Sequence, residues 1–503
     1  MAYANIDDNT YLKPLWNGFH YHHHQVVGVQ WMLNKERVGT LCPRRNGGAP
    51  TLVFGGFQCD DMGLGKTIQM AATMKNNPKR RTLLFAPLAM IETWSGVMKR
   101  CGFNVFVIDA KEWHVADEGE GEERAIHPKK PSVYITNYEK ILHSPSLFIG
   151  AGGVVWDRVV LDESHKIRTG DGAISVAMRK VVAPIRWAMT GTPLVNKRTD
   201  VVAQLAFLGI PVSQTFTWET HFEEIIQQIL IHRSLDSLRA VLPDAPPLPY
   251  IEEKILTFDS EAEAAFYRLI QGSIHAALAR RYARDVLTAQ EKLVMLVRLR
   301  QISVHPQVYI NAKRREDSEY DREDWTGTAT KLNALVRLIS EEAQSDHKYL
   351  VFCQFHDEMD LIAKHLVDNG IVEDGEIQQY HGGMSHKARN QALEEAKSDG
   401  CRVLLIQLHS GGVGLNLQEF DRCVFMSPWW TSALMDQAIA RAVRMGQRRV
   451  VRVIHLKLAE ERTMNIDRLI SDKARFKKAA LETIFRMAVE SSEWRHAAPT
   501  PPA

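Results

Sequence analysis

The chain has 503 residues, of which 45% are hydrophobic and 24% are charged. This composition is typical of globular proteins, and the length is sufficient for two or three sizeable hydrophobic cores. The 62 basic and 60 acidic residues leave a net charge of +2. Global charge is therefore excluded as a basis for nucleic-acid binding, and any such contact must come from local basic patches.

The cysteines and the N-terminus exclude further classes of protein. The six cysteines lie far apart and no pair has C-x-x-C spacing, which predicts neither a disulfide framework nor a zinc site and favours a reducing compartment. The first residues, MAYANIDDNTYLKP, have neither the positive charge nor the apolar stretch of a signal peptide. No run approaches the roughly 18 apolar residues that span a bilayer. We therefore expect an intracellular protein that binds neither membrane nor zinc.

Short apolar runs rich in β-branched residues alternate with helical patterns through the first half of the chain. They lie at Thr51–Phe54, Thr82–Phe85, Arg158–Leu161 and Ile185–Met189. Because parallel strands need crossover connections, which are usually helical, this alternation predicts a parallel sheet.

A glycine-rich turn follows the first of these runs, in the segment TLVFGGFQCDDMGLGKTIQM. Backbone N–H groups in such a turn point at phosphate oxygens, and the next helix adds the positive end of its dipole. Lys66 is suited to neutralise β- and γ-phosphate charge, and the Thr67 hydroxyl to ligate magnesium. The strict G-x-x-x-x-G-K-[ST] pattern fails at its first position, Asp60, so the turn alone is a weak signal. The predicted nucleotide-binding residues of this cradle are Asp61, Met62, Gly63, Leu64, Gly65, Lys66, Thr67 and Ile68.

A pair of carboxylates ends the third apolar run, in RVVLDESH (Arg158–His165). Asp162, at the C-terminal end of the expected strand, is placed to hold the magnesium ion with Thr67. Glu163 can orient or deprotonate the attacking water. The alternative is an acidic surface turn, the commonest fate of an Asp-Glu pair. The two motifs together favour an enzyme that hydrolyses ATP.

The middle of the chain has a different sequence pattern, a proline-rich segment followed by a long helical pattern. The segment VLPDAPPLPY (Val241–Tyr250) contains four prolines and cannot be a helix interior, so it is interpreted as a linker. Residues from about Glu261 to Val304 have continuous helical periodicity with arginines on one face.

A second set of apolar runs begins after this middle region. The runs lie at Tyr349–Phe352, Arg402–Ile406, Cys423–Met426 and Val450–Leu456. The chain is therefore predicted to be an α/β protein with two parallel-sheet lobes and helical insertions between them.

Further segments complete an ordered set of motifs. They are QVVGVQW (Gln25–Trp31), LLFAPLAMIETW (Leu83–Trp94), ITNYEKI (Ile135–Ile141), RWAMTGTPLVN (Arg186–Asn196), LVRLRQISVHP (Leu296–Pro306), YLVFCQF (Tyr349–Phe355), QYHGGMS (Gln379–Ser385), HSGGVGLNL (His409–Leu417) and SPWWTSALMDQAIARAVRMGQRRVVRV (Ser427–Val453). With the cradle and the carboxylate pair, this set resembles the SWI/SNF-type ATPases, a helicase-like branch of superfamily two. The resemblance extends from about His20 to about Lys473, nearly the whole chain.

The resemblance implies two RecA-like lobes and a site for ATP with Mg²⁺. In this family Gln25 would read the adenine and Gln437 would also contact the nucleotide. Arg441 and Arg444, three residues apart on one expected helical face, would meet the charge that develops on the transferred phosphoryl group. Since these arginines belong to the second lobe, hydrolysis would require the lobes to close.

The resemblance also implies a nucleic-acid partner and domain boundaries. Small residues that let backbone N–H groups approach a phosphate are expected at Thr190, Ser410, Gly411 and Gly412, so double-stranded DNA would be bound without base recognition. The expected organisation is an N-terminal segment (1–19), a first lobe (20–245), a helical and linker region (246–330), a second lobe (331–480) and a disordered tail (481–503).

The expected function is DNA-dependent ATP hydrolysis coupled to translocation and to remodelling of DNA-bound protein, including nucleosomes. The cradle context and the segment TATKL (Thr328–Leu332) resemble the repair-associated branch, although no cysteine-rich RING insert is present. A nucleus, or a viral replication compartment, would be the location. Two alternatives stay open, a strand-separating helicase and a catalytically silent DNA-binding scaffold.

Overall fold

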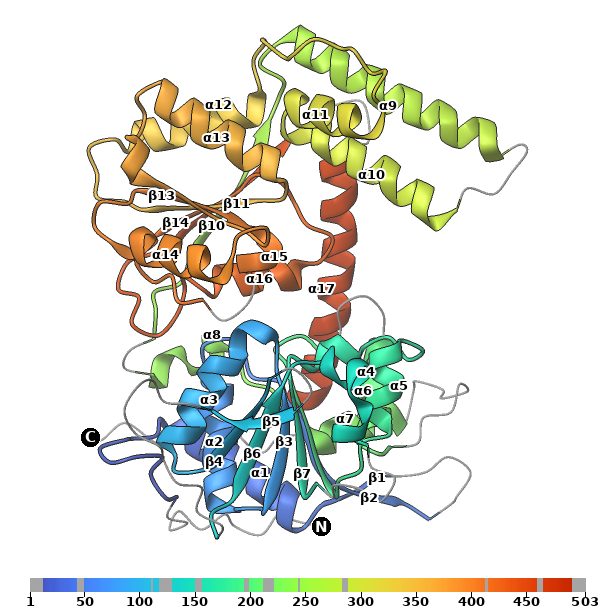
Figure 1. Ribbon diagram of the computed structural model, residues 1–503, viewed down its shortest axis with the longest axis vertical. Coiled ribbons are helices and arrows are strands. Elements are labelled where there is room, and N and C mark those ends of the chain that lie inside the picture. The colour runs from blue at the N-terminus through green and yellow to red at the C-terminus, as the bar shows by residue number, and fades with distance from the viewer. Residues whose placement is uncertain are drawn as a thin grey trace. The chain divides into compact units, whose positions relative to one another are not determined.

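Residues 12–42, 49–109, 112–116, 129–149, 156–193, 199–210, 221–242, 245–282, 288–411, 415–458 and 465–490 are described by a computed structural model (Figure 1). The chain divides into two units, the first formed by residues 1–243 with 477–503 and the second by residues 244–476. The chain thus passes from the first unit into the second and returns to the first. Each unit contains its own sheet and hydrophobic cores.

The first unit is built around a mainly parallel sheet with the strand order β1-β2-β8-β7-β3-β6-β4-β5. The bounds are β1 (Thr40–Cys42), β2 (Thr51–Gln58), β3 (Arg81–Phe85), β4 (Asn104–Asp109), β5 (Glu112–Val115), β6 (Ser132–Thr136), β7 (Arg158–Asp162) and β8 (Ile185–Met189). The strands from β2 to β4 in this order are parallel, while β1 and β5 are antiparallel edge strands. A short strand, β9 (Leu230–Ile231), pairs with the end of β2.

Helices cover both faces of this sheet (Figure 1). Their bounds are α1 (His23–Arg37), α2 (Lys66–Asn76), α3 (Ile91–Arg100), α4 (Lys140–His143), α5 (Ala173–Arg179), α6 (Thr199–Phe207), α7 (His221–Ile229) and α8 (Leu235–Leu238). Helices α1 to α3 contribute to the core that contains Val160, and α4 to α7 to the core that contains Val159 and Leu161. Successive residues of β7 thus face opposite cores, and all five are buried, as expected for a central parallel strand.

The second unit contains a sheet in which every strand pair is parallel, in the order β10-β15-β14-β11-β13-β12. The bounds are β10 (Tyr250–Leu256), β11 (Tyr349–Cys353), β12 (Ile377–Tyr380), β13 (Val403–Gln407), β14 (Arg422–Phe425) and β15 (Arg452–Leu458). Its helices are α9 (Glu261–Tyr282), α10 (Ala289–Val304), α11 (Pro306–Glu316), α12 (Thr330–Glu341), α13 (His356–Asp368), α14 (His386–Lys397), α15 (Leu408–Gly411) and α16 (Ser432–Ile439).

The last helix, α17 (Ile466–Glu490), is shared between the units because the boundary falls after Phe476. Ile466 and Ile470 pack beside Leu299 in the second unit. Leu481 and Phe485 pack against the core of the first unit.

The predicted α/β fold with two parallel-sheet lobes is confirmed, since each predicted apolar run coincides with a strand. Two expectations are wrong. The region expected to be helix and linker contains β10, which pairs with β15 along its whole length. The expected disordered tail begins inside α17, where the packing of the partly buried Leu481 and Phe485 compensates the ordering of the chain. The continuous helical stretch from Glu261 forms two helices, α9 and α10.

Candidate active site

Three neighbouring parallel strands carry the predicted catalytic motifs of the first unit. The cradle follows β2, Thr190 follows β8 and Asp162 ends β7, and these strands are adjacent in the order β2-β8-β7. The Thr190 N–H donates to the carbonyl oxygen of Gln58 over 3.1 Å, which joins the ends of β8 and β2. Since the strands are parallel, all three motifs lie at the same edge of the sheet, where α/β proteins generally bind ligands.

The cradle has a backbone that only glycine adopts readily. Gly63 and Gly65 have φ angles of 86° and 78°, in the left-handed region, and α2 begins at the next residue, Lys66. A Cβ atom on Gly65 would also lie 2.7 Å from Nε2 of Gln25. The structure therefore brings the predicted adenine-reading Gln25, buried on α1, directly against the cradle.

The Lys66 ammonium lies over the cradle itself. Its Nζ donates to the carbonyl oxygens of Asp60 over 2.6 Å and Asp61 over 3.2 Å. Its charge also acts on Asp162, where it opposes the rise in that carboxyl's pKa. The predicted phosphate-neutralising lysine and magnesium-binding aspartate therefore belong to one electrostatic site.

Asp60, the residue at which the phosphate-loop pattern fails, is a fully buried carboxylate. It accepts hydrogen bonds from Gln58 over 2.9 Å and from Gln69 over 3.0 Å, and it forms an ion pair with Arg233. Burial by itself would raise the pKa of Asp60, but the Arg233 charge and these hydrogen bonds hold the pKa below its usual value. Sequence reasoning missed Arg233 because its partner is 173 positions away.

His24 also touches the cradle, through its ring. His24 Nε2 lies 3.0 Å from the carbonyl oxygen of Leu64. Burial, with a smaller contribution from the Arg233 charge, lowers the pKa of His24 to about 4. The imidazole is therefore neutral near pH 7 and can donate its Nε2–H to Leu64.

Asp162 is held from both of its carboxylate oxygens. Trp94 Nε1 donates to Oδ2 over 2.7 Å, and the Glu163 N–H donates to Oδ1 over 3.0 Å. Tyr138 donates to the Asp162 carbonyl oxygen over 2.6 Å. Burial, followed by the Glu163 charge, raises the pKa of Asp162 to about 6. Each carboxylate oxygen retains lone pairs, so the donor set fits the oxygen coordination that Mg²⁺ prefers, with the Thr67 hydroxyl as the second predicted ligand.

Glu163 has a strained backbone, with φ 52° and ψ 51°. Among the described residues no other non-glycine residue has a positive φ, and such strain is common at functional sites. Its Oε2 lies 3.3 Å from His165 Nδ1 and 3.5 Å from the Thr190 hydroxyl. The structure thus brings together Glu163 and Thr190, two residues predicted for different roles.

A buried side-chain link joins the segments after β7 and β8. The Ser164 hydroxyl donates to Gln204 Oε1 over 2.6 Å, and Gln204 Nε2 donates to the Pro193 carbonyl oxygen over 2.7 Å. Gln204 lies on α6, so this helix fixes the two motif segments relative to each other.

The residues predicted in the second unit lie around α15 and α16. Gln437 is buried on α16. Ser410 and Gly411 belong to the backbone of α15, and Gly412 lies outside the described residues.

The expectation that Arg441 and Arg444 share a helical face is wrong. Helix α16 ends at Ile439, and the two arginines lie in the turns that follow. The Arg441 carbonyl oxygen accepts the Leu417 N–H over 3.0 Å and so takes no part in a helical hydrogen bond. Burial lowers the pKa of Arg444 from its usual value.

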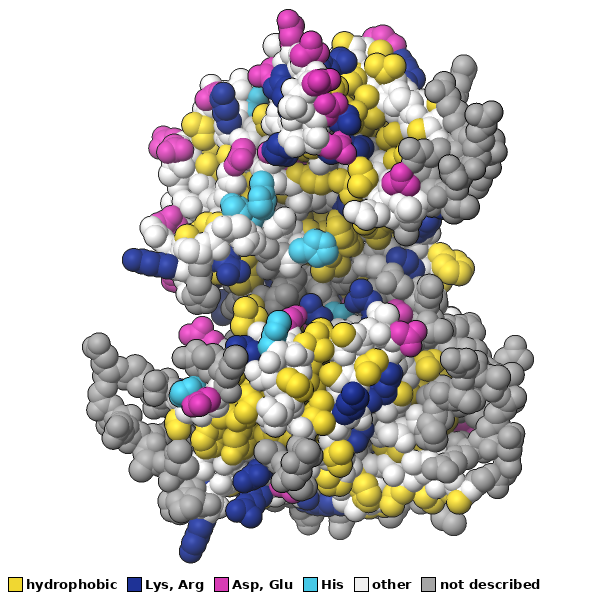
Figure 2. All heavy atoms as spheres, turned by 45° about the vertical axis from the view of Figure 1, so that its right-hand side comes forward, with side chains coloured by type: hydrophobic (Ala, Val, Ile, Leu, Met, Phe, Trp, Pro, Cys, Tyr) yellow, Lys and Arg dark blue, Asp and Glu magenta, His cyan; other side chains and the backbone are white. Residues whose placement is uncertain are grey.

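Basic side chains do not gather in one place on the face shown in Figure 2, where they are interspersed with acidic ones. The run Lys313-Arg314-Arg315 is engaged in ion pairs with Glu316, Asp324 and Asp357. No group of three or more His, Cys, Asp or Glu side chains suited to a metal occurs among the described residues. Within the same part of the chain, no helix is long and apolar enough to cross a membrane.

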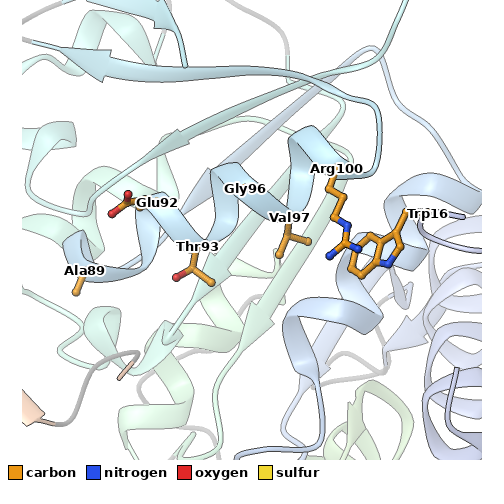
Figure 3. Close-up of a pocket in the computed structure, with 7 residues that line it drawn as sticks. All are labelled: Trp16, Ala89, Glu92, Thr93, Gly96, Val97 and Arg100. Carbon is orange, nitrogen blue, oxygen red and sulfur yellow. The ribbon is translucent and has the colours of Figure 1, made fainter. Parts of the chain in front are cut away.

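A shallow groove of about 380 Å³ lies on the exposed face of α3 (Figure 3). It is lined by Trp16, Ala89, Glu92, Thr93, Gly96, Val97 and Arg100, none of which belongs to the predicted site. The Arg100 guanidinium stacks on the Trp16 ring, 4.0 Å from its centroid. The opposite face of α3 carries Trp94, the hydrogen-bond partner of Asp162.

Comparison with known proteins gives matches along most of the chain. The SNF2-related domain family matches residues 24–349, and the helicase conserved C-terminal domain family matches residues 330–446. A protein of Orgyia pseudotsugata multicapsid polyhedrosis virus, "Probable global transactivator", is 26% identical over 467 residues, which cover 88% of this chain and 87% of the viral protein.

A mouse protein, SWI/SNF-related matrix-associated actin-dependent regulator of chromatin subfamily A member 1, is 25% identical over 470 residues. These residues cover 86% of this chain but 41% of the mouse protein. Among solved structures, the SWI2/SNF2 ATPase core of Sulfolobus solfataricus in complex with dsDNA is 20% identical, with a TM-score of 0.39. The match covers 96% of this chain and 100% of the Sulfolobus chain.

Proposed function

This chain belongs to the SNF2-related family of helicase-like ATPases, and we propose from this premise that it couples ATP hydrolysis to translocation on double-stranded DNA. The chain is an ATP hydrolase. The observation that carries the proposal is the convergence of Lys66, Asp162 and Glu163 at one edge of the first sheet. Phosphoryl transfer depends on positioning and charge neutralisation, which this arrangement can supply.

The proposed roles in the first unit combine the family resemblance with the contacts described above. The residues from Asp61 to Ile68 hold the phosphates, with Lys66 as the neutralising charge, and Gln25 reads the adenine. Thr67 and Asp162 hold Mg²⁺, which when bound neutralises phosphate charge. Glu163 orients the attacking water or accepts its proton, and its contact with the Thr190 hydroxyl offers a link to a predicted DNA-contact residue.

The second unit is proposed to supply Gln437, Arg441 and Arg444 to the same reaction. Arginines that meet developing phosphoryl charge contribute about 10³–10⁵ to the rate in related chemistry. Arg444 keeps its charge at neutral pH even though burial lowers its pKa, because an arginine titrates far above pH 7.

We further propose that the DNA contacts are made through the backbone around Thr190, Ser410, Gly411 and Gly412. The work done by translocation would be the remodelling of DNA-bound protein, nucleosomes included, in a nucleus or a viral replication compartment. The names of the mouse and viral relatives support a role on chromatin or in transcription. A role in DNA repair is a narrower form of the same proposal.

The test is the rate of ATP hydrolysis with no DNA, duplex DNA, single-stranded DNA and nucleosomal DNA. We expect duplex DNA to stimulate hydrolysis, and Lys66→Ala to abolish turnover because the phosphate charge is no longer neutralised. Lys180→Ala, a change of the same kind at an exposed position of the same unit, should leave the rate unaltered. An unmodified protein without DNA-stimulated hydrolysis would contradict the translocase and favour the DNA-binding scaffold.

A strand-separating helicase is the second candidate, because the matched C-terminal domain family is shared with helicases. The discriminating measurement is the opening of a forked duplex that carries no protein. Strong unwinding, with stimulation by single strands alone, would replace the translocase with a helicase.

A further inference from the structure

The chain connects the two units twice, and the two connections meet beside the cradle. The first passage leaves the first unit through β9, α8 and the 3₁₀ turn Arg239–Val241, and the second returns to it in α17. Neither connection contains a residue of the predicted site.

The outgoing segment is bonded to the cradle residue by residue. The Cys59 N–H donates to the Ile231 carbonyl oxygen over 2.8 Å, and the Asp61 N–H donates to the Arg233 carbonyl oxygen over 3.0 Å. The Asp61 carboxylate in turn accepts the Leu235 N–H over 2.9 Å. The backbone from Ile231 to Arg233 therefore continues the pairing of β9 with β2 as far as Asp61, two residues before the glycine-rich turn.

Arg233 is the centre of this connection. Its Nε donates to Asp60 Oδ1 over 3.0 Å, its Nη2 donates to Asp60 Oδ2 and, over 2.8 Å, to Gln69 Oε1. Its Nη1 donates to the His24 carbonyl oxygen. One guanidinium thus ties the outgoing segment to the cradle, to α2 and to α1.

Gly28 shows how closely these parts pack. A Cβ atom at this position of α1 would overlap Gln69 Oε1 and Arg233 Nη2. Neither atom can move away without giving up a hydrogen bond to the other or to the buried Asp60, so a larger side chain here must disturb the contact between Gln69 and Arg233.

The returning helix meets the outgoing segment at His232. The Phe485 ring stacks on the His232 ring with centroids 3.6 Å apart and planes 5° apart. His232 Nδ1 lies 2.8 Å from the carbonyl oxygen of Cys59, at the end of β2. Both chain connections therefore converge on His232 and Arg233, immediately beside the cradle.

We propose that Arg233 is a positioning residue that holds the cradle in the conformation that binds the nucleotide. Through Arg233 the presence or absence of bound nucleotide is transmitted to both chain connections. This inference rests on the proposed function, because transmission matters only if the units respond to the nucleotide. Lys66 bonds to the carbonyl oxygens of Asp60 and Asp61, the two residues that the outgoing segment holds. A nucleotide phosphate that draws Lys66 away from these carbonyls therefore acts on the residues paired with Arg233.

The first measurement is the affinity for a fluorescent ADP analogue with Mg²⁺. We expect Arg233→Gln to weaken binding at least tenfold. Arg233→Lys should lose less affinity because it keeps the positive charge, although it cannot form the bidentate hydrogen bonds to Asp60. Arg239→Gln, the same change six residues further along the same segment, should bind as the unmodified protein does. Gly28→Ala keeps the arginine but forces the side-chain ends of Gln69 and Arg233 to shift, and it should reproduce the weakened binding if Arg233→Gln does not fold.

The second measurement is hydrogen exchange in residues 230–242 and 477–485 with and without the ADP analogue. We expect the analogue to change exchange in both segments of the unmodified protein. Phe485→Ala should bind the analogue normally but lose the change in 477–485. Loss of thermal stability in Arg233→Gln with unaltered affinity, or unaltered exchange in the unmodified protein, would overturn the proposal. Neither readout needs DNA, so a failure of the translocase proposal is seen separately, as hydrolysis that duplex DNA does not stimulate.

Discussion

Asp162 carries a charge in an environment that disfavours it. The side chain is buried, its neighbour Glu163 is also acidic, and both of its oxygens already accept an N–H. Because the pKa of Asp162 is raised to about 6, the ionised carboxylate destabilises the folded protein above pH 6. This destabilisation disappears as the pH falls and the carboxyl is protonated. A bound cation would offset the same destabilisation, since a nearby positive charge favours the ionised form.

The activity is therefore expected to have an acid limb set by Asp162. At limiting ATP, kcat/KM reports the ionisations of the free enzyme, so its value should halve near pH 6 and fall about tenfold per pH unit below. Higher Mg²⁺ should move this limb to lower pH. A limb near pH 4 that does not respond to Mg²⁺ would show that Asp162 titrates as an ordinary aspartate.

The buried ion pair of Glu36 and Arg158 is a second place where a single residue strongly affects a measurable property, here the free energy of unfolding. The Arg158 side chain donates to Glu36 through Nε over 2.6 Å and Nη2 over 2.5 Å, and both side chains are almost inaccessible. Trp187 donates to the same carboxylate over 2.9 Å. Glu36→Gln should lower the free energy of unfolding by about 3–5 kcal/mol, because it leaves the Arg158 charge buried without its partner.

Urea denaturation measures this loss. The control is Glu261→Gln, the same change in an exposed ion pair with Arg268. The Glu261 side chain is 82% exposed, so this change should alter the free energy of unfolding by no more than about 0.5 kcal/mol. Equal losses in the two variants would refute the importance of burial.

At the level of residues, the motif members could be predicted because their neighbours in the chain identify them. Lys66 and Asp162 each stand at a fixed offset from a strand end. Arg233 and Trp94 could not, since they reach the site from distant elements and only the folded sheet brings them there.

The strands were the elements that sequence predicted best, because central parallel strands are buried on both faces and appear as continuous apolar runs. β10 lacks that signature. Tyr250, Ile251 and Ile255 are each more than half exposed, acidic residues lie between them, and prolines precede the strand. Its partner β15 is about 200 positions away, so the pairing that makes it a strand is invisible locally.

Helix α10 offers a test of an element that local sequence does determine. Thr288 accepts the Glu291 N–H over 3.2 Å, and the Glu291 carboxylate accepts the Thr288 N–H over 3.0 Å, a reciprocal cap. Thr288→Ala should destabilise the first turn by about 1 kcal/mol. Hydrogen exchange in residues 289–297 should rise about fivefold, whereas Thr93→Ala, on the exposed face of α3, should leave exchange in α3 nearly unaltered. No rise in α10 would mean that packing, not the cap, holds its start.

At the scale of the whole molecule, the two sheets could be predicted but the division of the chain could not. The first unit includes residues after 477, which follow the entire second unit. Nothing local in the sequence indicates that α17 continues to Glu490 and packs Leu481 and Phe485 against a core formed by the first half of the chain.

The net charge of +2 makes the salt dependence of DNA binding a decisive whole-molecule measurement. If the protein grips the DNA backbone, each phosphate contact releases counterions whatever the net charge is, and six to ten contacts would weaken binding about 10³–10⁵-fold between about 50 and 200 mM salt. Two duplexes of unrelated sequence should give the same steep slope. Arg315→Ala should not alter it, because that guanidinium is already paired with Asp357. A shallow slope, or a preference for one sequence, would refute binding through the backbone.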